Sequence, residues 1–350
     1  SALMASVVLY SDAVRDLGLR YALRNAEPTE RNVRVVTSGR PALEDYRRRR
    51  EQVDVLLEQY LGGVLEGVVH FGRTATFYVA KPGAPVPEDA NRPRGHFQFA
   101  DGLREHVEVV EGAWPRLPTG DGGPRPEVEA AIGKEAADRI GVRVGDAFDL
   151  YPFWREDVAP VRVVVTAIVA PRHLDEPYWF GRRDRFALET SWDTYPFWVD
   201  EGAVAETVAP YLPDMDSTLE TYGFVDIGAI DARNAKAVEG SARALGIVLR
   251  EAVPNVVFET RLAEVIGSYQ SKLFFTRLPL FALMLQIVGI ALYYLVMVSS
   301  MLVERQHGEI ALFRSRGGSP GQVVAVYGIE AALICGAGAL AGPFLAAGAI

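Results

Sequence analysis

The chain has 350 residues, of which 49% are hydrophobic, and a formal net charge of −9 at pH 7. This length accommodates two ordinary domains, and the acidic balance argues against nucleic acid as the main partner. The single cysteine, Cys335, excludes a disulfide framework or a cysteine-based metal site elsewhere in the chain.

The chain begins with the apolar run SALMASVVLY, which lacks the charged start and the cleavage site of a signal peptide. We expect residues 1–10 to be the end of a first transmembrane helix and the sequence to be a fragment of a longer protein. Residues 12–25 follow with apolar side chains at helical spacing, which predicts a helix.

Residues 11–277 carry the pattern of an α+β domain. The run Arg47–Arg50 falls on a predicted helix among acidic neighbours, and we interpret it as a solvated face rather than a lipid or nucleic-acid site. An aromatic-rich segment, 175–213, is expected to be irregular, and 81–94 a loop. The predicted helices are 41–61, 134–140, 234–252 and 262–277, and the predicted strands lie in 33–36, 64–79, 106–112, 128–132, 147–153, 161–169, 224–230 and 255–260.

Two long apolar stretches follow this domain. Residues 278–303 contain no formally charged side chain, and residues 323–350 contain one, Glu330. A helix over the first stretch is ~39 Å long, against a bilayer hydrocarbon core of ~30 Å. The sequence therefore predicts transmembrane helix 2 over 278–303 and a truncated transmembrane helix 3 over 323–350.

The polar connector between the two spans, residues 304–322, is short and contains residues that end one helix and start another. We expect a helix that ends at Gly317–Gly318, and then a new helix capped by Ser319, with Pro320 in its first turn and Gln322 completing a capping box. Arginines close to both spans place the connector in the cytoplasm and the large domain outside.

The connector and the start of the second span, ERQHGEIALFRSRGGSPGQVVAVYGIEAALICGAGALAG, resemble the signature of FtsX-like permeases, the membrane subunits of MacB-type and lipoprotein-releasing ABC transporters. The preceding domain resembles the MacB-like extracytoplasmic domain of that family. The positions that carry the resemblance are Glu304, Arg305, Glu309, Ile310, Ala311, Arg314, Gly317 and, in the third helix, Glu330.

The resemblance implies a permease subunit in a bacterial inner membrane, which transmits the ATP-driven motion of a partner ATPase to the outer domain for export or extraction of an envelope substrate. The implied partners are an ABC ATP-binding subunit, the lipid bilayer, a permease dimer mate or second permease half, and an envelope protein or lipoprotein. The implied coupling residues are Glu304, Arg305, Glu309, Ile310, Ala311, Arg314, Gly317 and Ser319.

The sequence contains no phosphate-binding loop of the G-x-x-x-x-G-K-[ST] type. We therefore expect no cofactor in this chain, with ATP and Mg²⁺ bound by the separate partner subunit. No histidine pair has metal-ligand spacing. His173, near Asp175 and Glu176, is interpreted as part of a surface cluster rather than a cation site.

Aromatic residues gather in the second half of the outer domain, with acidic residues nearby. One interpretation is a substrate or partner patch formed by Trp154, Tyr178, Trp179, Trp192 and Trp198. An aromatic platform with carboxylates is also typical of sugar-processing sites, so a membrane-anchored enzyme acting on envelope glycans is an alternative function, as is a non-transporting sensor or scaffold. We favour a structural role for the aromatics, in a core or a membrane-facing belt.

Overall fold

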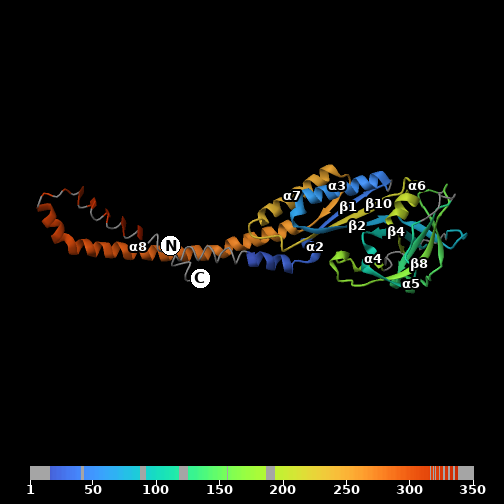
Figure 1. Cartoon of the computed structure of the whole chain (residues 1–350), viewed down its shortest axis with the longest axis horizontal. Helices are drawn as coiled ribbons and strands as arrows, with labels where there is room; N and C mark the ends of the chain where they lie inside the picture. The colour runs from blue at the N-terminus through green and yellow to red at the C-terminus, as the bar shows by residue number, and fades with distance from the viewer. Residues whose placement is uncertain are drawn as a thin grey trace. The chain divides into compact units, whose positions relative to one another are not determined.

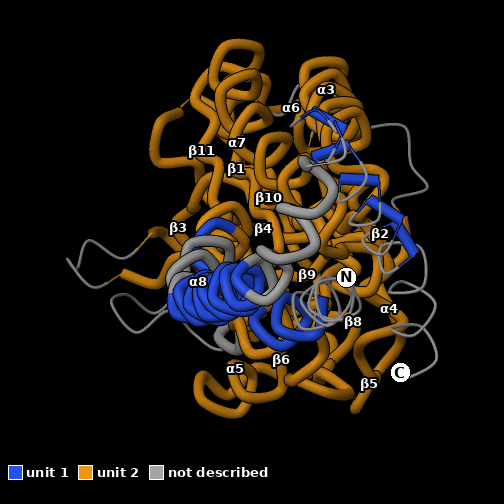
Figure 2. Tube along the Cα trace, turned by 90° about the vertical axis from the view of Figure 1, so that its left-hand side faces the viewer, with its two compact units in different colours: residues 1–22, 267–350 blue, residues 23–266 orange. Residues whose placement is uncertain are grey.

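The computed structural model describes residues 16–40, 43–86, 92–117, 125–155, 157–186 and 194–315, and positions 317, 319, 321–322, 324–325, 328–329, 332–333 and 336–337. The chain divides into a larger unit, Leu23–Ile266, and a smaller unit formed by Ser1–Ala22 and Gly267–Ile350 (Figure 2). Residues 1–10, the predicted end of a transmembrane helix, lie outside the described residues, whereas 16–25 are helical as expected.

The larger unit mixes strands and helices, in agreement with the expected fold class. Its strands are β1 (Val33–Gly39), β2 (Leu65–Thr74), β3 (Phe77–Ala80), β4 (Arg94–Ala100), β5 (Val107–Gly112), β6 (Glu127–Gly133), β7 (Ala147–Tyr151), β8 (Val161–Pro171), β9 (Thr194–Trp198), β10 (Ser217–Val225) and β11 (Val257–Glu259). Its α-helices are α2 (Pro28–Arg31), α3 (Leu43–Leu61), α4 (Leu103–His106), α5 (Lys134–Ile140), α6 (Ala209–Tyr211) and α7 (Ala235–Ala252).

Six strands close into a ring. In the order β4, β3, β7, β8, β6 and β9, each strand pairs with the next, and β9 pairs back with β4. Alternate side chains of a strand point to opposite faces, so every second residue faces the inside of the ring. Val161, Val163 and Val165 of β8 follow this period, and they pack in one fully buried apolar cluster with Phe77, Phe97, Ile132, Leu150 and Phe197.

A second sheet, β2, β10, β1 and β11, continues from the ring through the pairing of β2 with β4. The corner lies between the end of β2 at Thr74 and the start of β3 at Phe77. There the hydroxyl of Thr74 accepts a hydrogen bond from the Phe97 backbone N–H at 3.0 Å, and the Ala75 N–H donates to the Asp216 carbonyl at 2.7 Å. These bonds satisfy backbone groups that the break in the strand would otherwise leave unpaired.

Helices α3 and α7 lie side by side on one face of this second sheet (Figure 1). Val53, Leu57 and Leu61 of α3 recur at a spacing of four residues and are buried, so they form the apolar stripe of an amphipathic helix. A Cβ on Gly223 of β10 would lie 3.9 Å from Leu57. The odd-numbered residues of β10 around Gly223 therefore face α3, and the even-numbered ones face the opposite side.

Two predictions need correction, and one strand was not predicted. Strand β9 lies inside the expected irregular segment 175–213. Strand β4 begins at Arg94, the last residue of the expected loop 81–94, and continues through residues for which no element was predicted. Strand β10 ends at Val225, whereas we predicted a strand over 224–230; instead the chain turns at Asp226, whose carboxylate accepts the Gly228 N–H at 2.7 Å. The polar residues inside these strands face a cavity described below. Because these residues interrupt the run of apolar side chains that is typical of a buried strand, the strands were not predicted from hydrophobicity.

The basic run on α3 is only partly a solvated face. Arg47 and Arg48 are exposed, as expected, and Arg48 pairs with Asp45. Arg50 is instead half-buried, and it donates to Asp101 at 2.8 Å and to Glu201 at 3.0 and 3.1 Å. One arginine of the run therefore attaches α3 to the turn at Asp101 and to the helical segment that starts at Glu201, in the same unit.

His70 of β2 belongs to the same ionic network. Its Nδ1 lies 2.7 Å from Asp101 and its Nε2 lies 2.8 Å from Asp54 of α3, and the side chain is 5% exposed. Burial favours the neutral ring, but the hydrogen bonds to the two carboxylates outweigh it and raise the pKa of His70 above its ordinary value of about 6.5.

We expect the larger unit to lose stability as the pH rises through the raised pKa of His70. A group whose pKa is higher in the folded state than in the unfolded state stabilises the folded state when it is protonated. This stabilisation is complete at a pH below the unfolded-state pKa and is lost as the pH rises through the folded-state pKa. His70→Gln should therefore show a smaller fall in melting temperature than wild type between about pH 6 and about pH 9. Tryptophan fluorescence of the full chain in detergent measures this, because all five tryptophans lie in the larger unit. Equal falls in both proteins would contradict it.

The long helix α8 spans Leu262–Ser315. Its first turn is buried in the larger unit, at Leu262, Ala263 and Ile266. Among the described residues, one helical stretch is long and apolar enough to cross a membrane, Phe281–Met301, and its large apolar side chains are exposed. This stretch lies within the predicted span 278–303. The described positions between 321 and 337 are helical, while most of the predicted span 323–350 lies outside the described residues.

Candidate functional site

The predicted connector, 304–322, begins inside α8 rather than after it. The helix passes through positions 303 and 304 without a break and ends at Ser315. Glu304 is exposed. Arg305 and Glu309 are four residues apart in this helix and so occupy neighbouring positions on one helical face. The side chains at 305–316, which include Ile310, Ala311 and Arg314, lie outside the described part.

The helix ends as the glycines predict. Gly317 has a φ of 94°, in the left-handed region, two residues after the last residue of α8. A left-handed glycine at this position is a common helix terminator, because it lets the last backbone carbonyls find partners without a clash from a Cβ. The helix end that was expected at Gly317–Gly318 is therefore confirmed by the last residue of α8, Ser315, and by the left-handed Gly317; Gly318 lies outside the described residues.

The next helix starts with the expected capping box. The Gln322 N–H lies 3.4 Å from the Ser319 hydroxyl, and the Ser319 N–H donates to the Gln322 side-chain oxygen at 3.1 Å. Two backbone donors at the start of the helix are thereby satisfied reciprocally. The connector thus consists of the end of one helix, a left-handed glycine and the capped start of the next helix. The backbone of its charged segment, 304–315, is helical.

Most of the predicted aromatic patch is interior. Trp179 is fully buried and Trp198 is 1% exposed, and both belong with Tyr178 to an apolar cluster outside the ring. Trp154 is half-buried against the separate cluster inside the ring. Trp192 lies outside the described residues. These four described aromatics do not meet on one surface, and their burial supports the core interpretation over a sugar-binding platform.

The cluster near His173 also has a structural role. Glu176 accepts a hydrogen bond from His106 at 2.7 Å, the His106 ring stacks on Tyr178 at 3.7 Å, and the His173 carbonyl accepts the Trp179 indole N–H at 2.9 Å. Within the described residues, no group of three or more histidine, cysteine, aspartate or glutamate side chains is placed to hold a metal ion.

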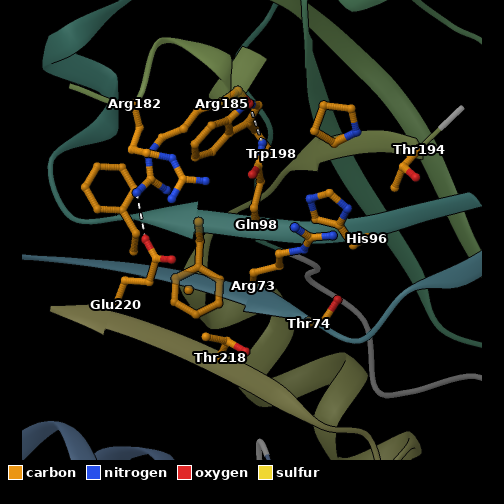
Figure 3. Close-up of a pocket in the computed structure, with 14 residues that line it drawn as sticks. Arg73, Thr74, His96, Gln98, Arg182, Arg185, Thr194, Trp198, Thr218 and Glu220 are labelled. Carbon is orange, nitrogen blue, oxygen red and sulfur yellow. Dashed lines mark hydrogen bonds and ion pairs between the residues drawn. The ribbon is translucent and has the colours of Figure 1, made fainter. Parts of the chain in front are cut away.

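The larger unit contains a polar cavity of about 250 Å³ that sequence patterns did not reveal (Figure 3). Its floor is a row of paired residues that crosses four strands: Thr218 of β10, Arg73 of β2, Gln98 of β4 and Trp198 of β9. Even-numbered residues of β10 line it, so it lies on the face of the second sheet opposite α3. Arg182 and Arg185, at the short 3₁₀ helix η3 (Arg183–Phe186), complete its wall.

Arg185 is fixed by three groups around this cavity. It donates to Glu220 at 2.8 Å, its guanidinium lies 3.9 Å from the centre of the Phe71 ring, and its backbone carbonyl accepts the Gln98 side-chain N–H at 3.2 Å. Glu220 also binds Arg34 at 2.8 Å. Burial opposes the charge of Glu220, but these arginines and the Tyr222 hydroxyl outweigh it and lower its pKa to about 2.

His96 occupies another part of the wall, where Figure 3 shows its ring beside the Arg73 guanidinium. The residue is 3% exposed. Burial and the positive charge of Arg73 lower the pKa of His96 to about 3, so its ring is neutral at physiological pH. The sequence does contain one signal for this cavity. Polar residues occupy every second position in strands that are otherwise buried, at His96 and Gln98 of β4 and at Thr218 and Glu220 of β10.

No protein-family model matches the chain, and no curated protein matches it. Among solved structures, the extracellular domain of the noncanonic ABC-type transporter YknZ from Gram-positive bacteria is similar over 65% of this chain and 98% of that chain, with 11% sequence identity and a TM-score of 0.30. A TM-score of this size carries no argument about fold or function.

Proposed function

We propose that the chain is a permease subunit of an ABC transporter that transmits the motion of a partner ATPase to an extracytoplasmic domain. The observation that carries this proposal is the connector: the charged segment 304–315 at the end of α8, the left-handed Gly317 and the Ser319–Gln322 capping box follow an apolar stretch that can span a membrane. Its residues are those that resemble the FtsX-like signature.

In this proposal the connector is the coupling helix. Glu304, Arg305, Glu309 and Arg314 contact the ATPase subunit, which binds ATP and Mg²⁺, while Gly317 and Ser319 fix the turn that follows. Helix α8 carries a displacement of the connector, because the same helix, with Pro279 inside it, extends from the connector to the buried turn at Leu262. The larger unit is then the moving part in the envelope, where it exports or extracts a substrate, and this chain performs no covalent chemistry.

Charge reversal in the connector tests the proposal. Glu309→Lys and Arg314→Glu should each abolish the stimulation of ATP hydrolysis that the permease gives to its co-purified ATPase subunit, because a reversed charge at a docking contact replaces attraction with repulsion. The measurement is ATPase activity of the reconstituted complex, with co-purification as a second readout.

A matched pair of variants controls for charge alone. Glu251→Lys and Arg250→Glu make the same changes at exposed positions at the end of α7, and they should leave both readouts at wild-type values. If both connector variants coupled ATP hydrolysis as wild type does, the assignment of the connector would be wrong.

A further inference from the structure

We propose that one face of α8 packs inside the membrane against this chain's own segment 331–346, so that the two form an antiparallel helical hairpin. This face, the α8 stripe, is defined by six residues that recur every three or four positions: Gln286, Gly289, Tyr293, Met297, Ser300 and Glu304. The inference rests on the part of the proposed function that places α8 in a membrane, and it does not depend on coupling to an ATPase.

The α8 stripe differs in composition from the rest of the apolar stretch Phe281–Met301. It holds the one glutamine, the one glycine and one of the two tyrosines of that stretch, whereas the remaining positions are mostly leucine, isoleucine, valine and methionine. Tyr293 is 69% exposed and Met297 is 50% exposed. The described part of the chain therefore leaves the α8 stripe uncovered.

Two polar groups of the α8 stripe require a protein partner inside a bilayer. Among the described residues, no hydrogen bond is found for the side chain of Gln286 or for the hydroxyl of Tyr293. The Ser300 hydroxyl, in contrast, donates to the Val296 carbonyl at 2.9 Å. A polar group without a partner is costly in hydrocarbon, and membrane helices place such groups at contacts with other helices. The α8 stripe therefore faces another helix rather than lipid.

The turn after α8 makes the chain's own next helix this partner. Helix α8 ends at Ser315 and the next helix starts at the Ser319 cap, with the left-handed Gly317 between them. A connection this short joins helices that are antiparallel neighbours. Both helices rise ~1.5 Å per residue, so residues equally far from the turn lie side by side in a hairpin.

This register brings large residues of α8 against small residues of the returning segment. Counted outward from the two ends of the turn, at positions 315 and 320, the level pairs are Gly289 with Ala346, Tyr293 with Gly342, Met297 with Gly338, Ser300 with Cys335, and Glu304 with Ala331. Small residues allow the backbones of two membrane helices to approach closely. A tyrosine and a methionine four residues apart thus meet two glycines four residues apart, so the two faces are complementary in size.

The charged residues near the turn agree with the same register. Glu330 is the one charged residue of the second apolar stretch, and it comes level with Arg305, since each is ten residues from its end of the turn. Arg305 lies beyond Met301, the last residue of the stretch that can span a membrane. The hairpin thus keeps Glu330 out of the hydrocarbon core, where a charged side chain is costly.

One substitution tests the hairpin, because the level partner of Ser300 is the native cysteine, Cys335. We expect Ser300→Cys, oxidised with copper phenanthroline in alkaline-washed membranes, to form a disulfide within one chain. Level residues on closely packed helices meet the Cα separation of roughly 4.4–6.8 Å that a disulfide needs. After denaturation, a maleimide–polyethylene glycol reagent should label neither cysteine on a band of monomer mass. The wild type should keep its one labelled thiol.

Matched controls separate orientation and close approach from proximity alone. Ser299→Cys makes the same change one residue away, outside the α8 stripe, and should form about tenfold less of the intrachain disulfide because its side chain points to another face. In the Ser300→Cys background, Gly338→Leu should lower disulfide formation severalfold, because a large side chain separates the helices. Gly336→Leu, at a position outside the level pairs, should leave disulfide formation unchanged.

Three results would overturn the hairpin: equal disulfide yields from Ser299→Cys and Ser300→Cys, two labelled thiols in Ser300→Cys, or disulfide-linked dimers as the main product. The last result would show that a second copy of the chain covers the α8 stripe. Each of these results leaves the proposed transport function intact, because the chain is still in the washed membranes. Release of the chain by the alkaline wash would instead overturn the proposed function and the hairpin together.

Discussion

Asp149→Asn should lower the free energy of unfolding of the larger unit by about 3 kcal/mol, the lower end of the range for a broken buried ion pair. The Asp149 side chain is 1% exposed. It accepts hydrogen bonds from Arg162 at 3.0 and 3.3 Å and from the Gly83 N–H at 3.0 Å, and it pairs with Arg125. The variant leaves two guanidinium groups without their counter-charge. The lower end applies because both arginines are about one-third exposed and water can solvate them.

Chemical unfolding of the full chain in detergent, followed by tryptophan fluorescence, measures this loss. Asp157→Asn is the matched control: Asp157 also pairs with an arginine, Arg155 at 2.8 Å, but its side chain is 69% exposed. An exposed carboxylate is hydrated when its arginine partner is absent, so this ion pair contributes little to the free energy of unfolding. The control should therefore unfold as wild type does. A wild-type unfolding curve for Asp149→Asn would show that the pairs at Asp149 do not stabilise the fold.

Trp179→Ala should cost about 3–5 kcal/mol, the range for truncating a large buried aromatic side chain. Trp179 is fully buried, its ring lies 4.7 Å from that of Tyr178 and 5.2 Å from that of Phe186, and its N–H donates to the His173 carbonyl at 2.9 Å. The substitution leaves a cavity among these rings and an unpaired carbonyl. The measurement is the same unfolding experiment.

This variant also decides between the two interpretations of the aromatic segment. A core residue loses stability when it is truncated, whereas a residue of a binding patch loses function and keeps the stability of the fold. Phe153→Ala, at a site 56% exposed, is the control and should have a much smaller effect. If Trp179→Ala kept wild-type stability and lost transport, the patch interpretation would replace the core interpretation.

Local signals in the sequence were sufficient for the longer helices α3, α5 and α7 and for the helix end and helix start of the connector, but not for the short helices α2, α4 and α6. The helix α7 begins and ends within one residue of its predicted bounds, and the glycine terminator and the Ser319–Gln322 capping box were both expected from residues only three to five apart. Such features depend on backbone groups close in sequence, so a short stretch of residues contains all the information.

The missed strands depend on contacts between residues that are distant in sequence. Strand β9 contains Pro196, which argues against a strand because proline cannot donate to a ladder. Its parallel partner, β4, lies a hundred residues earlier, at Arg94↔Thr194. The cavity was missed for the same reason: Arg73, Gln98, Trp198 and Thr218 are neighbours only because four strands pair in this register.

The ring has a consequence for how this unit can be divided. Its strands β3 to β9 form an insertion in the sequence between β2 and β10, two strands that pair with each other. Excising the insertion would keep β1, β2, β10 and β11 but would strip β4 from β2, whose freed backbone groups would then invite edge-to-edge association. The ring therefore covers an edge of the sheet that carries it, and that sheet would lose the protection of this edge if the ring were removed.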